Sequence, residues 1–368
     1  MSGIYIHIPF CRQACHYCNF HFSTSLRKKD ALLNALAKEI ELCEKSGEVV
    51  ETVYFGGGTP SILETGEIDD LLKKIHRNYT VAAGAEITLE TNPDDITREK
   101  LIAWKVSGVN RLSIGIQSFF EEDLRWMNRA HSAEQAVENL KLAREYFENI
   151  TIDLIYGVPG LSNEKWKQNI ETAIQLNIPH LSCYALTVES KTPLDKLIRT
   201  NKKADVDAGQ QSEQFLLLMK WAREAGYEHY EISNFAKPGY RSRHNSSYWQ
   251  RKHYIGLGPA AHSYNGVERT WNVANNQKYI DAIAKGIIPQ EKEMLTETQR
   301  FNEYIMTALR TIEGIDLTLL DEESRPYIAG VAQKYIRQEL ITLNDDKLQL
   351  TDKGKLFADG IASDLFRD

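Results

Sequence analysis

Short apolar runs alternate with longer amphipathic segments from residue 4 to about residue 235. The apolar runs are rich in β-branched and aromatic residues and predict strands at residues 4–8, 52–55, 86–91, 111–116, 150–155 and 180–185. Helical spacing of apolar positions occurs between them, near residues 28–45, 65–78, 97–107, 133–147, 163–176 and 207–225. This alternation predicts an α/β protein in which parallel strands form a sheet and helices cover its outer face.

Six β–α units are too few for the complete eight-stranded barrel. The pattern therefore favours a partial (β/α)6 barrel, which we place at residues 1–235. In such a sheet, ligands gather where the strands end at their carboxyl side. The polar motifs described below all follow the ends of predicted strands.

The tail of the chain has a different pattern. Residues 236–295 form a connecting segment, and residues 296–368 contain helices followed by a hairpin that turns at Asn344-Asp345-Asp346. Helices followed by a two-stranded ribbon predict a C-terminal α+β, winged-helix-like domain. Such domains often bind DNA, but carboxylates would repel the phosphates here, at Asp345, Asp346, Asp352, Asp359 and Asp364. We expect this domain to pack against the barrel.

The amino-acid composition disfavours several classes of function. The formal net charge of −7 disfavours binding to nucleic acid, which needs a basic surface. No apolar run approaches the ~18 residues of a membrane span, and the first residues lack the pattern of a signal peptide. We therefore expect a cytoplasmic location, where thiols stay reduced. Cys43 and Cys183 lie in helix and strand patterns and are interpreted as core residues.

The other three cysteines, Cys11, Cys15 and Cys18, follow the first strand with C-x3-C-x2-C spacing. A [4Fe–4S] cluster normally takes four cysteine ligands, so three would leave one iron open to a small molecule. The same spacing also fits one face of a helix, although Pro9 favours a loop. Zinc is a further alternative, with His7, His16 or His21 completing a Cys3His site.

Polar residues and glycines end the next strands. Residues 54–61 read Tyr-Phe-Gly-Gly-Gly-Thr-Pro-Ser, and the glycines would let the backbone approach a ligand. Glu90 ends the third strand, and Gln117 ends the fourth. Asp153 lies within the apolar fifth strand, where an unpaired carboxylate is costly to bury. These residues predict a ligand site at the carboxyl edge of the sheet.

Together these motifs resemble the radical S-adenosylmethionine (SAM) superfamily and, within it, the HemN/HemW family. The likeness rests on the cysteine loop, the Gly-Gly-Gly-Thr-Pro turn, Ser-Ile-Gly-Ile-Gln-Ser-Phe at residues 113–119 and Asp-Leu-Ile-Tyr-Gly-Val-Pro-Gly at residues 153–160. It implies that Cys11, Cys15 and Cys18 hold the cluster and that SAM binds beside it. The SAM contacts it implies are Tyr5, Tyr17, Gly57, Gly58, Thr59, Glu90, Gln117, Arg129, Asp153 and Ala185.

Within that family, three features resemble the heme chaperones more than the coproporphyrinogen III dehydrogenases. Phe20 stands where the dehydrogenases have a fourth cysteine, and the first strand starts without their N-terminal arm. Residues 244–249 match the H-N-x-x-Y-W motif of the chaperones, and His244, Tyr248 and Trp249 become candidate heme contacts. Residues 236–267 also lack Asp and Glu and are rich in Arg, Lys and His, which suits porphyrin propionates, with a solvated basic loop as the alternative.

The resemblance therefore implies a protein that binds heme, a [4Fe–4S] cluster and SAM, and delivers heme to acceptor proteins, which we expect to be membrane-bound respiratory proteins. Association with the membrane would then occur through the acceptor. One alternative is an oxidoreductase that decarboxylates coproporphyrinogen III with SAM-derived radicals. A more distant alternative is a radical SAM enzyme with an unrelated substrate. The sequence leaves open whether the chain is an enzyme and whether it forms a homodimer.

Overall fold

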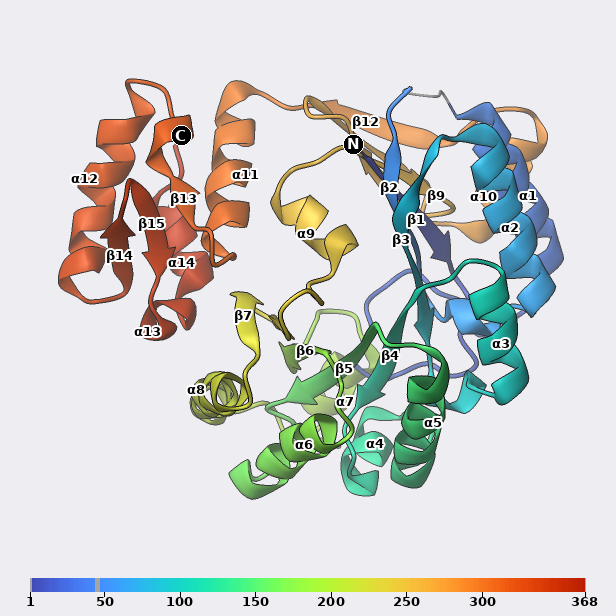
Figure 1. Cartoon of the computed structure of the whole chain (residues 1–368), viewed down its shortest axis with the longest axis horizontal. Helices are drawn as coiled ribbons and strands as arrows, with labels where there is room; N and C mark the ends of the chain where they lie inside the picture. The colour runs from blue at the N-terminus through green and yellow to red at the C-terminus, as the bar shows by residue number, and fades with distance from the viewer. Residues whose placement is uncertain (1, 44–46, 368) are drawn as a thin grey trace.

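The computed structural model describes residues 2–43 and 47–367. Six parallel strands lie side by side in chain order and form the predicted partial barrel (Figure 1). They are β1 (Ser2–Ile8), β2 (Val50–Gly57), β3 (Val81–Thr91), β4 (Arg111–Gln117), β5 (Ile150–Tyr156) and β6 (His180–Ala185). The prediction of a radical SAM type α/β barrel is confirmed.

Helices between these strands cover the outer face of the sheet (Figure 1). In α2, for example, Ile68, Leu71, Leu72 and Ile75 form one buried stripe, and a capping box between Glu64 and Glu67 starts the helix. The helices between the strands are α1 (Lys29–Leu42), α2 (Thr65–Asn78), α3 (Arg98–Val106), α4 (Glu121–Met127), α5 (Ala133–Tyr146) and α6 (Asn163–Gln175), and α8 (Ala208–Glu224) follows β6. The short helix α7 (Pro193–Arg199) also follows β6 and meets the cysteine loop, where the Leu194 N–H donates to the His16 carbonyl at 2.8 Å. Two 3-10 turns, at Pro60–Ile62 and Pro93–Asp95, follow β2 and β3.

Further strands extend the sheet at both edges to a total of twelve among the described residues. β8 (Asn234–Ala236) pairs antiparallel with β6, and β7 (Glu228–Glu231) pairs with β8. At the other edge, β9 (Tyr254–Leu257) runs parallel to β1. Outside it lie β10 (His262–Tyr264), β11 (Glu268–Asn272) and β12 (Gln290–Met294). The connecting segment thus covers the open edge of β1, whose backbone would otherwise be unpaired.

The last part of the chain forms a module with its own small core, built around buried residues such as Ile305, Ile328 and Leu348. Its antiparallel sheet has the order β13–β15–β14, which confirms the expected hairpin. The elements are α11 (Glu297–Leu309), β13 (Ile315–Asp316), a 3-10 turn (Leu317–Leu319), α12 (Ser324–Arg337), β14 (Ile341–Asn344), β15 (Lys347–Leu350), α13 (Asp352–Lys355) and α14 (Ala358–Asp364).

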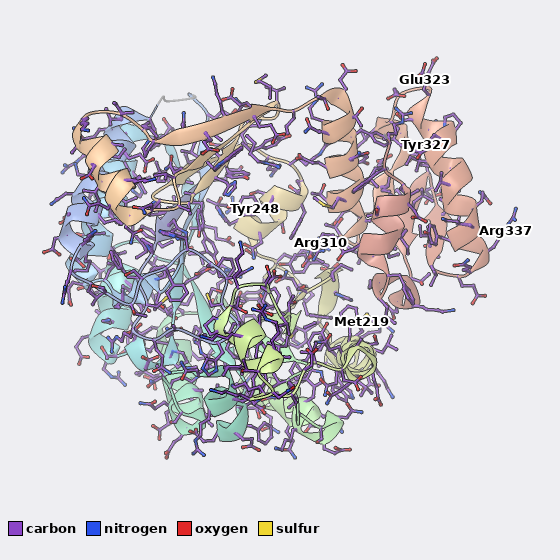
Figure 2. All side chains as sticks on the ribbon, turned by 180° about the vertical axis from the view of Figure 1, so that it is seen from behind. Met219, Tyr248, Arg310, Glu323, Tyr327 and Arg337 are labelled. Atoms are coloured by element: carbon purple, nitrogen blue, oxygen red, sulfur yellow. The ribbon has the colours of Figure 1, made fainter. Side chains whose placement is uncertain are left out.

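Arg310 joins this module to the barrel (Figure 2). Its guanidinium lies 3.0 Å from the buried Glu231 carboxylate and 5.1 Å from the centre of the Trp249 ring. A second ion pair, between Arg241 and Glu313, has a distance of 2.7 Å. Trp249 ends α9 (Arg243–Trp249), a short helix that lies between the sheet and the module (Figures 1 and 2).

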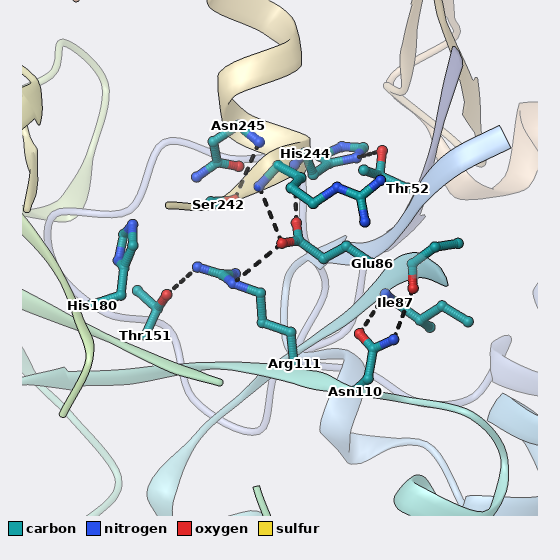
Figure 3. A network of polar contacts seen from close by, with 12 residues as sticks. Thr52, Glu86, Ile87, Asn110, Arg111, Thr151, His180, Ser242, His244 and Asn245 are labelled. Carbon is teal, nitrogen blue, oxygen red and sulfur yellow. Dashed lines mark hydrogen bonds and ion pairs between the residues drawn. The ribbon is translucent and has the colours of Figure 1, made fainter. Parts of the chain in front are cut away.

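A buried polar network fills the end of the barrel where the strands begin (Figure 3). Glu86 accepts hydrogen bonds from the backbone N–H groups of Arg243 and His244, at 3.1 and 2.9 Å. Arg111 approaches the Glu86 carboxylate to 3.9 Å and donates to the Thr151 hydroxyl. These contacts hold the start of α9 against the barrel. Within the described residues, no helix has the length and apolarity to cross a bilayer.

Candidate functional site

A cavity of about 470 Å³ opens where β2 to β6 end, beside the cysteine loop. It brings together every residue that was expected to contact the cluster or SAM, with the exception of Tyr5. Those that line it are Cys11, Cys15, Cys18, Tyr17, Gly57, Gly58, Thr59, Glu90, Gln117, Arg129, Asp153 and Ala185. Residues far apart in the sequence therefore share one cavity, at the edge of the sheet that the topology predicts.

The cysteines lie on a loop after β1 and not on a helix. The Cys11 backbone N–H donates to Ser23 at 3.0 Å, which closes the loop. The Thr59 hydroxyl donates to the sulfur of Cys11 at 3.5 Å, and the Arg129 guanidinium donates to the sulfur of Cys15 at 3.3 Å. The interpretation as one face of a packed helix is therefore wrong, and donors are in place for thiolates.

The three histidines that could complete a zinc site form hydrogen bonds to other groups. A ring nitrogen of His7 hydrogen-bonds to the backbone carbonyl of His21, and a ring nitrogen of His16 to that of Trp126. A ring nitrogen of His21 hydrogen-bonds to the side chain of Asn276. Across residues 2–43 and 47–367, no three His, Cys, Asp or Glu side chains are grouped as one metal ion would require. A cubane cluster differs because each thiolate binds a separate iron, so the sulfurs surround a larger body.

The glycine turn packs directly against the cysteine loop. A Cβ atom on Gly58 would lie 2.6 Å from the carbonyl oxygen of Phe10, closer than side-chain carbons come in proteins. Gly57 has a φ of +110°, which favours glycine, and its N–H donates to the Glu90 carboxylate at 3.2 Å. The turn therefore needs glycine in order to lie this close to the cysteines and to Glu90.

Two carboxylates face the cavity from neighbouring parts of the sheet. Glu90 also accepts a hydrogen bond from the Tyr54 hydroxyl at 2.7 Å. Burial raises the pKa of Glu90 to about 7 and that of Asp153 to about 6, and the negative charge of Asp153 adds to the effect on Glu90. A bound cation would lower both pKa values again. SAM carries a sulfonium and an ammonium group, so the charge of this pair suits it.

Arg129 crosses the cavity wall. Its guanidinium donates to the Asn92 side chain and to the Gly115 carbonyl, both at 2.8 Å. Its Nε atom has no hydrogen-bond partner within the described part of the chain, which leaves a buried donor for a ligand. Gln117, at the end of β4, has a φ of +69°, a strained conformation that typically costs about 1–3 kcal/mol and is common at functional sites.

Sequence reasoning missed several lining residues, notably Asn92, Tyr184 and Glu189. Asn92 orients Arg129 and donates to Thr59 at 3.2 Å. Its signal was the polar residue before a proline at a strand end, next to Glu90. Tyr184 and Glu189 lie near the end of β6, where no motif marked them.

Tyr5 and two of the candidate heme contacts, Tyr248 and Trp249, lie in the wall of a second cavity of about 530 Å³. His244 lines neither of these two cavities and is buried behind Tyr248. Its ring nitrogens bond the Thr52 hydroxyl at 2.8 Å and the Tyr248 hydroxyl at 2.9 Å. Burial lowers the pKa of His244 to about 3, so the ring is neutral. In this conformation neither nitrogen is free to bind iron.

Acidic residues from other segments balance much of the positive charge in residues 236–267. Arg241 pairs with Glu228 and Glu313, both at 2.7 Å, and His253 pairs with Glu48 at 2.7 Å. The cluster of cations in the sequence is therefore partly neutralised in the fold.

Comparison with known proteins shows to which class of protein this chain belongs. Residues 5–173 match the radical SAM superfamily, and residues 295–357 match the HemN C-terminal domain. The structure of coproporphyrinogen III oxidase (HemN) from Escherichia coli has the same fold, with a TM-score of 0.85 over 99% of this chain and 90% of that chain, at 24% sequence identity. The fold and the three-cysteine loop are those of a radical SAM protein.

Sequence identity narrows the class to one family. The chain is 35% identical to the heme chaperone HemW of Bacillus subtilis (strain 168), over 98% of each chain. It is 32% identical to the heme chaperone HemW of Escherichia coli (strain K12), over 98% of this chain and 96% of that protein. The chain belongs to the HemW family.

Membership of the radical SAM superfamily implies a [4Fe–4S] cluster and SAM. The cavity fits them, because Cys11, Cys15 and Cys18 would hold the cluster while Glu90 and Asp153 face the adjacent space. When bound, the reduced cluster supplies one electron to the sulfonium of SAM. The chain itself supplies the donors to the sulfurs, the carboxylates for the cation and the buried guanidinium.

Proposed function

We propose that this protein is a heme chaperone that holds a [4Fe–4S] cluster and SAM in its barrel, binds heme, and transfers the heme to acceptor proteins. The observation that carries the proposal is the full-length identity with heme chaperones, 35% over 98% of both chains in one case. The structure supports it with two neighbouring cavities. One fits the cluster and SAM, and the other has the aromatic wall that a porphyrin requires.

A second candidate is oxygen-independent decarboxylation of coproporphyrinogen III. The close match of the fold to HemN favours it, and so does the presence of Gln117, Arg129 and Asp153 around one cavity. Phe20 favours the chaperone, because it stands where the dehydrogenases have a fourth cysteine and is 68% exposed at the cavity.

Heme titration of the anaerobically reconstituted protein tests the first candidate. We expect a saturable change in the visible spectrum at about one heme per chain. The same preparation, given SAM, a reductant and coproporphyrinogen III, should form no protoporphyrinogen, while HemN from Escherichia coli serves as the positive control. Decarboxylation without saturable heme binding would reverse the assignment.

The acceptors that we propose are membrane-bound respiratory proteins, and the chaperone would meet them from the cytoplasm. The test is transfer of heme from the loaded protein to an apo-cytochrome in vesicles, followed in the reduced-minus-oxidised spectrum. The control is heme-loaded serum albumin, which should transfer heme more slowly. Equal rates from the two donors would contradict active delivery.

A further inference from the structure

The second cavity lies on the other side of β1 from the cluster site. Its walls come from β1, β9, β10 and β11, from α9, and from α11 of the C-terminal module. Phe20 lines both this cavity and the cluster cavity, so the two spaces adjoin. The lining also includes four tyrosines, three histidines and the guanidinium groups of Arg251 and Arg269.

The wall is suited to a flat apolar ligand. Tyr248 and Tyr254 meet edge to face, with their ring centres 4.7 Å apart, and Tyr264 lies 6.2 Å beyond Tyr254. Met306 and Phe20 are 42% and 68% exposed, which leaves large apolar side chains without cover. A cavity of about 530 Å³ is within the usual range for cofactor sites.

One imidazole in this cavity has a free ring. His7 uses both ring nitrogens, on Tyr5 and His21, and one nitrogen of His21 bonds Asn276. Among the residues that the structure describes, no group hydrogen-bonds to the ring of His262, which is exposed and stacks on Trp271 at 6.1 Å. Burial of part of the ring lowers the pKa of His262, which favours the neutral form that binds metals.

The cavity also holds a cation without a carboxylate partner. Arg269 pairs with Glu303 at 2.8 Å. Arg251 stacks over Tyr304, 4.7 Å from the ring centre, and reaches only the Arg300 carbonyl, at 3.5 Å. In the described part of the chain, Arg251 forms no ion pair. A guanidinium in this position can bind a carboxylate with two parallel hydrogen bonds.

We propose that iron porphyrin binds in this second cavity. A ring nitrogen of His262 is the axial ligand of the iron, and the guanidinium of Arg251 binds a propionate of the porphyrin. The inference rests on the proposed chaperone function and adds the location and ligand of the heme. His244 is then a positioning residue, because it holds the hydroxyl of Tyr248 from behind and does not touch the ligand. The shared Phe20 places the porphyrin next to the cluster cavity.

Spectroscopy of full-length variants that lack the proposed axial ligand tests where the heme binds. Wild-type protein, His262→Ala and the control His253→Ala, whose histidine pairs with Glu48 away from the cavity, are titrated with ferric heme. We expect His262→Ala to shift the Soret band and the electron paramagnetic resonance signal of the ferric iron, and added imidazole to restore both. His253→Ala should match the wild type, and His262→Cys should give a thiolate-type spectrum.

The outcomes separate this inference from the proposed function. Absence of saturable heme binding by the wild type would overturn the chaperone function itself. Saturable binding that His262→Ala leaves unchanged in spectrum and affinity would overturn only the location. Loss of the axial-ligand spectrum in a folded His244→Gln variant, with His262→Ala unaffected, would also overturn it and transfer the role to His244.

Affinity measurements test the propionate contact. Arg251→Gln should raise the dissociation constant for heme by about tenfold, as expected for the loss of a charge-assisted hydrogen bond. The matched control is Arg325→Gln, which removes a surface ion pair with Asp346 in the C-terminal module and should leave heme affinity unchanged. Equal affinity of Arg251→Gln and the wild type would contradict the proposed orientation.

Discussion

Asp153 offers the sharpest test of the electrostatics of the SAM site. Burial raises its pKa from the usual 3.8 to about 6, and no ion pair with the carboxylate forms among the described residues. We predict that Asp153→Asn makes the ligand-free protein more stable at pH 8 while it weakens SAM binding. The asparagine keeps the shape of the side chain and removes the charge that folding must bury.

The direction of the change in stability with pH follows from the linkage between proton binding and folding. A raised pKa means that the folded protein binds the Asp153 proton more tightly than the unfolded chain does, so stability falls as pH rises from about 4 to about 6 and stays low above that. A shift of this size would correspond to about 3 kcal/mol for a fully buried group. Asp153 retains some exposure to the cavity, so we expect a gain of about 1–2 kcal/mol for Asp153→Asn at pH 8.

Urea unfolding of the ligand-free protein at pH 5 and pH 8, followed by circular dichroism, measures both free energies. The stability difference between variant and wild type should be larger at pH 8 than at pH 5. Isothermal titration with SAM should show weaker binding to Asp153→Asn at pH 8. A variant that is no more stable than the wild type at pH 8, or that has the same pH dependence, would refute the argument.

Three further variants test other parts of the structure. Cys15→Ala should lose the iron of the reconstituted cluster, whereas Cys43→Ala should keep about four irons per chain by chemical analysis; iron retained in Cys15→Ala would exclude the cluster site. Gly58→Ala should lower the melting temperature and the cluster content, because the new Cβ would lie 2.6 Å from the Phe10 carbonyl oxygen; an unchanged melting temperature would contradict this packing. Glu86→Gln removes the charge opposite a buried guanidinium and should lower the free energy of unfolding in urea by about 3 kcal/mol; a loss below about 1 kcal/mol would show that the network contributes little.

Local patterns were sufficient for the barrel and most of its cavity. The six parallel strands and the six longer helices of residues 4–225 have a period that their own residues carry, and the topology of parallel units brings the strand ends to one edge. The short helices α4 and α7, of seven residues each, were not predicted. Cys11, Glu90 and Asp153 could therefore be assigned to one site before the fold was known. Asn92 had a local signal in its place before Pro93, but its hydrogen bond to the distant Arg129 could be seen only in the fold.

Contacts between segments that lie far apart in the sequence determined the remaining features of the fold and of the site. The sequence determined the order of the β–α units, the cysteine loop and the need for glycine beside it, because these depend on neighbouring residues. Only the tertiary structure placed the strands of residues 254–294 against the open edge of β1 and put both ring nitrogens of His244 on hydroxyl groups. Tyr5 likewise belongs to the second cavity, because β9 and the HNxxYW helix close that side of β1. Such pairings depend on which surfaces remain uncovered once the barrel has formed, and no local sequence pattern encodes them.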